Sequence, residues 1–88
     1  MAQDRLSAVE EENRKMRKLR WIVDLTIGVL YQDPHLSVAE ARHMVENVRR
    51  AALNLFPGKE ATFDIVLRPR FERVLKERWG KGLDSRIH

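Results

Sequence analysis

The sequence contains no cysteine, so neither disulfide bonds nor thiolate metal ligands can stabilise the fold. It also contains no internal repeat and no low-complexity linker. The longest apolar stretch, residues 21–31, is about half the length of a membrane-spanning helix and includes Asp24. The N-terminus is charged and lacks the apolar region of a signal peptide. Together these absences predict a soluble, cytoplasmic protein.

The remaining composition is typical of one small helical domain. A chain of 88 residues buries only about 60% of the surface that its unfolded form exposes, so its own core is marginal. Charged residues make up 34% of the chain and hydrophobic residues 43%, which favours a folded, helix-rich domain over disorder. Stability must therefore come from helix packing or from oligomerisation.

Local signals divide the chain into three helices, and we predict an all-α bundle. The first helix is expected at about 4–31, because Asp33-Pro34 cannot continue it. Ser37 and Glu40 form the pattern of a capping box at the start of a second helix, at about 38–56. Within one domain, residues 1–18 are expected to protrude as an arm, 19–80 to form the core and 81–88 to form a flexible tail.

The third segment, at about 59–79, follows the helix-stopping pair Pro57-Gly58. Pro69 removes one helical hydrogen bond and crowds the carbonyl of Ile65, so we expect a kink near Arg68. The composition of residues 62–67 also fits a β-strand, but no second strand is evident to pair with it.

A heptad seam runs along the first helix. Apolar residues, interrupted by Asn13 and Arg20, recur at alternating steps of three and four. Such a stripe favours a partner helix lying alongside. The predicted dimer interface consists of Leu6, Val9, Asn13, Met16, Val23, Ile27 and Leu30.

The region from Trp21 to Tyr31 is apolar on nearly every face, so one side of it can pack internally while the other side needs a further surface. A second copy of the chain is the preferred partner. Asn13 at a core position favours a parallel pair, whereas an antiparallel pair or a four-helix arrangement is also compatible with the pattern. The alternative is a solvated arm that frays, because isolated short helices are marginal in water.

No pattern of catalytic residues is present, so we expect no enzymatic activity and no cofactor. Glu40 and His43 form one Glu-x-x-His pair, but a di-iron site in a helical bundle needs two such pairs and further carboxylates. Asp33, His35 and His43 could meet across the loop, although Asp-Pro-His is ordinary turn chemistry. We therefore predict no metal site.

The C-terminal third is the basic end of a chain whose net charge is +4. Phosphate contacts in nucleic-acid binding proteins come from such cations, here Arg68, Arg70, Arg73 and Lys76. Glu72 and Glu77 can neutralise the same face through pairs along the helix. The preferred hypothesis is thus a homodimeric interaction or regulatory module with an unknown protein partner, and a nucleic-acid-associated protein is the alternative.

Overall fold

A computed structural model describes the backbone of residues 2–84 and the side chains of residues 7–80. Three long helices carry the fold: α1 (Ala2–Gln32), α2 (Val38–Leu55) and α4 (Arg68–Asp84). A short α3 (Glu60–Thr62) and a π-helix, η1 (Phe63–Leu67), join α2 to α4. The described residues contain no strand, so the prediction of an all-α bundle is confirmed and the strand alternative at 62–67 is wrong.

The first two helices begin and end close to the predicted residues because local chemistry determines their ends. The Ser37 hydroxyl accepts a hydrogen bond from the Glu40 N–H at 3.1 Å, and the Glu40 carboxylate accepts one from the Ser37 N–H at 3.3 Å. This completes the capping box at the start of α2. After α2 the chain turns through Gly58, whose φ of 80° is a backbone conformation that favours glycine.

The third helical segment differs in detail from the expected kink. The backbone of Arg68 keeps helical dihedral angles, and the helix widens over η1, where the Arg68 N–H bonds to the Phe63 carbonyl five residues back. Such a turn directly precedes Pro69, which has no N–H to donate. The irregular backbone lies later, at Trp79. Residues 81–84, expected in the tail, are helical in α4, and residues 85–88 lie outside the described part of the chain.

The core lies between α1, α2 and α4. α2 contributes a regular stripe of buried residues because they recur with the period of a helix. α4 contributes Phe71, Val74 and Leu75, and Phe71 stacks on Phe63 with ring centroids 6.4 Å apart. The buried hydrophobic residues are Val23, Leu30, Ala41, Val45, Val48, Ala52, Phe63, Phe71, Val74 and Leu75.

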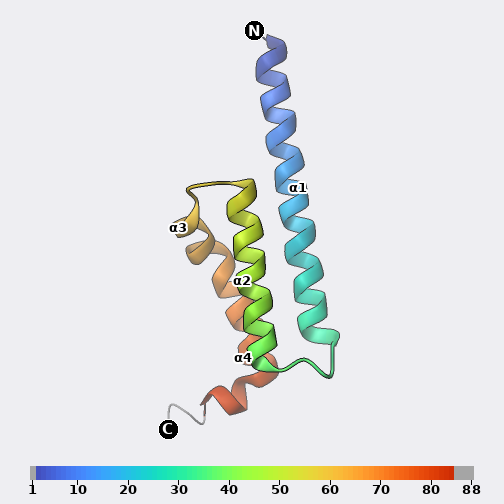
Figure 1. Cartoon of the computed structure of the whole chain (residues 1–88), viewed down its shortest axis with the longest axis vertical. Helices are drawn as coiled ribbons and strands as arrows, with labels where there is room; N and C mark the ends of the chain where they lie inside the picture. The colour runs from blue at the N-terminus through green and yellow to red at the C-terminus, as the bar shows by residue number, and fades with distance from the viewer. Residues whose placement is uncertain (1, 85–88) are drawn as a thin grey trace.

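α1 is much longer than the helices that cover it. Figure 1 shows α1 continuing well past the end of α2, so that its first half projects from the bundle. The molecule is correspondingly elongated, with principal extents of 59 × 24 × 16 Å. We refer to residues 2–18 of α1 as the arm.

Candidate interaction surfaces

The structure divides the predicted seam into an exposed and a buried half. On the arm, Val9 and Met16 are 52% and 45% exposed, and Asn13 is also exposed. In the bundle, Val23 and Leu30 are buried against the other helices of the same chain, and Ile27 is partly buried beside them. The second half of the seam therefore contributes to the internal core, and only the arm keeps its stripe accessible. The side chain of Leu6 lies outside the described residues.

A second apolar stripe lies on the face of α1 that points away from the bundle. Trp21, Leu25 and Val29 follow one another at steps of four residues and are 65%, 53% and 36% exposed. This spacing places them along one helix face. No heavy atom outside the local helix lies within 4 Å of the position that a Cβ would take at Gly28, so the adjacent surface is open. The outward stripe is the uncovered side of the apolar stretch that the sequence indicated.

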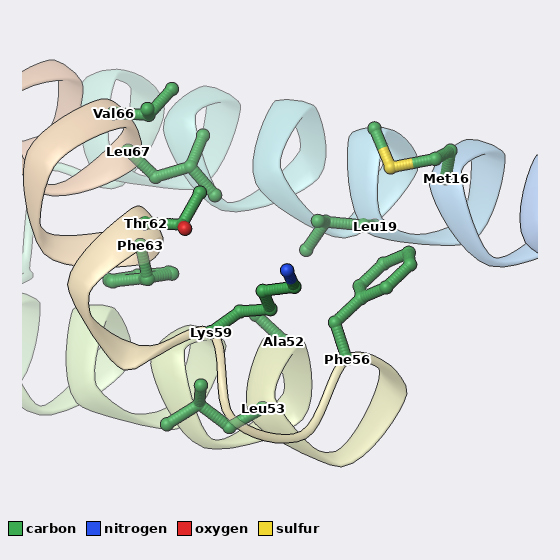
Figure 2. A pocket seen from close by; sticks show the side chains of 10 residues that line it. All are labelled: Met16, Leu19, Ala52, Leu53, Phe56, Lys59, Thr62, Phe63, Val66 and Leu67. Carbon is green, nitrogen blue, oxygen red and sulfur yellow. The ribbon is translucent and has the colours of Figure 1, made fainter.

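The third surface is an apolar groove of about 300 Å³ where the arm leaves the bundle. α1 contributes Met16 and Leu19, and the end of α2 contributes Ala52, Leu53 and Phe56. The opposite wall consists of Thr62, Phe63, Val66 and Leu67, and Lys59 lies at the connecting loop (Figure 2). The groove was not predictable from the sequence, because it exists only where α1 packs beside the distant segment 52–67. Its only sequence signal was the excess of bulky apolar residues in 63–67.

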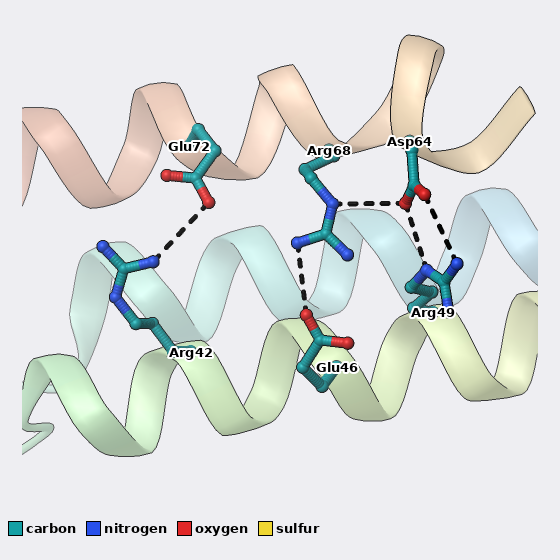
Figure 3. A network of polar contacts seen from close by, with 6 residues as sticks. All are labelled: Arg42, Glu46, Arg49, Asp64, Arg68 and Glu72. Carbon is teal, nitrogen blue, oxygen red and sulfur yellow. Dashed lines mark hydrogen bonds and ion pairs between the residues drawn. The ribbon is translucent and has the colours of Figure 1, made fainter. Parts of the chain in front are cut away.

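Charged side chains bridge α2 to η1 and α4 (Figure 3). The Asp64 carboxylate accepts hydrogen bonds from Arg49 at 3.0 Å and from Arg68 at 3.2 Å. Arg68 also reaches the Glu46 carboxylate at 3.1 Å. A more distant pair, with 3.7 Å between nitrogen and oxygen, joins Arg42 to Glu72.

The network removes one member from the predicted anion-binding cluster. Arg68 is partly buried, makes ion pairs with two carboxylates and lies 6.0 Å from the centroid of the Phe63 ring. Arg70, Arg73 and Lys76 are exposed and, among the described residues, make no ion pair within 4.0 Å. The structure thus assigns Arg68 to the ion-pair network and leaves three cations of the cluster on the surface.

Hydrogen bonding changes the ionisation of two groups that join the helices. The bonds from Arg49 and then Arg68 lower the pKa of Asp64, against an opposing effect of desolvation. At the other end of the bundle, the Tyr31 hydroxyl donates to the Glu77 carboxylate, and this bond is the largest cause that raises the pKa of Tyr31. Both pairs are exposed, so each should contribute only modestly to stability.

The lowered pKa of Asp64 predicts a pH-dependent contribution to folding. Because the folded pKa lies below the unfolded one, the contribution is present above the ordinary aspartate pKa and is lost as pH falls through the lowered value. Asp64→Asn should therefore lower the urea midpoint at neutral pH and have little effect at about pH 2. Glu60→Gln, at an exposed position of α3, serves as the matched control. An equal loss at both pH values would contradict the electrostatic explanation.

The structure does not bring the acidic and histidine residues considered as metal ligands together into a site. Glu40 and His43 are both exposed on α2, and His35 is exposed in the preceding loop. The Asp33 carboxylate instead accepts a hydrogen bond from the His35 N–H at 2.9 Å, as in an ordinary turn. Among the described residues, no group of three or more His, Cys, Asp or Glu is placed to hold a metal ion.

Comparison with protein-family models, with curated proteins and with solved structures finds no match in any of the three. Within the described part of the chain, no helix combines the length and the apolar composition needed to cross a membrane. The interaction surfaces are therefore the features from which a function can be inferred.

Proposed function

We propose that this chain is a noncatalytic interaction module that works in the cytoplasm as a homodimer paired through α1. The observation that carries the proposal is the exposed seam of the arm, on which Val9 and Met16 are 52% and 45% exposed. The arm itself projects from the bundle (Figure 1). A single projecting helix of this length is marginal in water. A second helix packed on the seam would bury these side chains and stabilise the arm.

Pairing through the arm would leave the outward stripe of α1 available on both copies. Trp21, Leu25 and Val29 present apolar side chains at helical spacing, which suits an amphipathic helix of a partner protein. The open surface at Gly28 would allow such a helix to approach closely. In this proposal, one side of α1 joins the two copies and the other side binds the partner.

Light scattering on matched variants tests which side of α1 forms the dimer. The wild-type protein is expected to be a dimer at micromolar concentration. Val9→Asp/Met16→Asp should convert it to the 10.4 kDa monomer, because it places charges in the seam. Trp21→Ser/Leu25→Ser should remain dimeric and should bind less of a hydrophobic dye. A monomeric wild type would overturn the proposal, and loss of the dimer only in the second variant would move the interface to the outward stripe.

The exposed cations of α4 support a second candidate function. Arg70, Arg73 and Lys76 are accessible, and a dimer would present two such groups to a nucleic-acid backbone. Glu77 on the same helix opposes this by reducing the local positive charge. A binding titration with generic DNA and RNA decides the matter: affinity that falls steeply with salt would support it, whereas no binding at low salt would eliminate it.

A further inference from the structure

The arm carries opposite charge at its two ends. Residues 4–12 include four acidic residues and one basic residue, for a net charge of −3. Residues 14–18 include four basic residues and no acidic one, for a net charge of +4, and Arg20 follows just beyond the arm. Within the described residues, the only ion pair on the arm joins Lys15 to Glu12, at 3.9 Å. Most of this charge is therefore available to another molecule.

The apolar groove lies beside the basic end of the arm. On α1, the groove is lined by Met16 and Leu19, whose neighbours in the sequence are the basic residues of 14–20. Lys59, at the connecting loop, contributes a further positive charge (Figure 2). Val66, on the opposite wall, is 57% exposed. A helix that fills this groove must supply an apolar stripe to cover the walls and acidic residues to face the surrounding cations.

The chain contains a segment with this chemistry. Leu6 and Val9 are spaced for one helix face, and the three glutamates at 10–12 follow them. We propose that the groove of each copy receives the first turns of α1 from a second copy, in an antiparallel exchange of arms. This arrangement rests on the homodimer proposed above, and it specifies where the second copy lies.

The length of the arm fits this exchange. From Leu6 to Arg20 the helix rises about 21 Å at 1.5 Å per residue. Two arms can overlap over that length if they run in opposite directions. The first turns of α1 in one copy then reach the groove of the second copy. Residues 10–12 then lie opposite residues 14–16 of the second copy, which include Arg14 and Lys15, and Asn13 lies near the two-fold axis. One two-fold operation fills both grooves, so the assembly closes as a dimer.

A parallel arrangement lacks these features. It places the acidic end of one arm beside the acidic end of the other, and the two basic ends side by side. It also carries the first turns of both arms away from the grooves (Figure 1). The pairing of opposite charges and the burial of the apolar groove therefore both favour the antiparallel exchange. Asn13 alone favoured the parallel pair.

Cysteine cross-linking tests the arrangement directly, because the chain has no cysteine of its own. Val9→Cys and Val66→Cys protein are mixed and treated with a short thiol-reactive cross-linker. The exchange predicts a product that joins the two different variants and little Val9–Val9 product. A predominant Val9–Val9 product in the single variant, with none between positions 9 and 66, would place the two Val9 positions side by side and overturn the proposal.

A matched pair of substitutions in the groove tests the role of charge. Val66→Glu and Val66→Lys both remove an exposed apolar side chain, but only the first opposes an acidic arm. Val66→Glu should weaken the dimer by about tenfold or more, and Val66→Lys should leave it nearly unchanged. Equal effects of both would show that the acidic arm does not occupy the groove.

These experiments separate the two proposals. A wild-type protein that is monomeric by light scattering overturns both the dimer and the exchange. A wild-type dimer that gives no cross-link between positions 9 and 66, and that responds equally to both Val66 substitutions, overturns the exchange alone.

Discussion

Replacing Phe71 by alanine is expected to lower the free energy of unfolding by about 3–5 kcal/mol. Phe71 is fully buried and stacks on Phe63 with an angle of 19° between the ring planes, so alanine would leave a large cavity between the helices. Domains of this size have a total stability of about 5–15 kcal/mol, and small ones lie near the lower end. A large fraction of the variant should therefore be unfolded at physiological temperature, as urea unfolding followed by circular dichroism would show.

Two control variants define the cause of the Phe71 effect. Phe71→Leu keeps most of the buried volume and should lose clearly less stability than the alanine variant. Ile65→Ala removes a side chain that is 74% exposed, so it should change stability by less than about 0.5 kcal/mol. A Phe71→Ala effect below about 1 kcal/mol would show that α4 does not pack on the core as described.

Replacing Arg78 by alanine is expected to destabilise the protein by about 2–3 kcal/mol, because two carbonyls at the end of α1 would lose a charged donor. The guanidinium of Arg78 donates to the carbonyls of Leu30 and Asp33 from a partly buried position. The last turn of α1 has no basic residue of its own, so α4 provides the cation that complements the helix dipole. The same guanidinium lies 4.7 Å from the ring centroid of Trp79.

The Arg78→Lys variant shows whether the stabilising effect of Arg78 comes from its positive charge or from the geometry of its two hydrogen bonds. Lysine keeps the positive charge, but its single ammonium lacks the planar fork that reaches two separate carbonyls, so it should restore only part of the lost stability. Arg73→Ala, on the exposed face of the same helix, should have little effect on unfolding. Full recovery by lysine would mean that charge at the end of α1 is sufficient and that the two hydrogen bonds add nothing.

The elements of the fold were largely predictable because their ends depend on neighbouring residues. Asp33-Pro34, the Ser37–Glu40 capping box and Pro57-Gly58 act within a few residues, and the helices begin and end accordingly. The third segment was harder to predict. Pro69 predicted a disturbance of the helix, but a sharp kink and a widened turn are alternative responses to the same missing N–H. Packing of Phe63 against Phe71 accompanies the widened turn.

The candidate surfaces were only partly predictable, because periodicity places residues on a face without showing what covers that face. The all-round apolar stretch of α1 predicted that some side would remain uncovered, and Trp21 and Leu25 are exposed there. Arg68 was grouped with the surface cations, yet it pairs with Asp64, four residues before it, and with Glu46 on α2, which only the packing of the helices brings near. The groove needed α1, α2 and η1 to be assembled before it existed.

The sequence by itself determined that the chain folds into helices, where two of them end, and that one stripe runs along α1. Only the tertiary structure decided how that stripe is divided. Met16 and Val23 are one heptad apart on it, yet Met16 is 45% exposed and Val23 only 2%. The physical reason is length: α2 has 18 residues against 31 in α1, so the bundle covers the second half of the stripe and leaves the first half exposed.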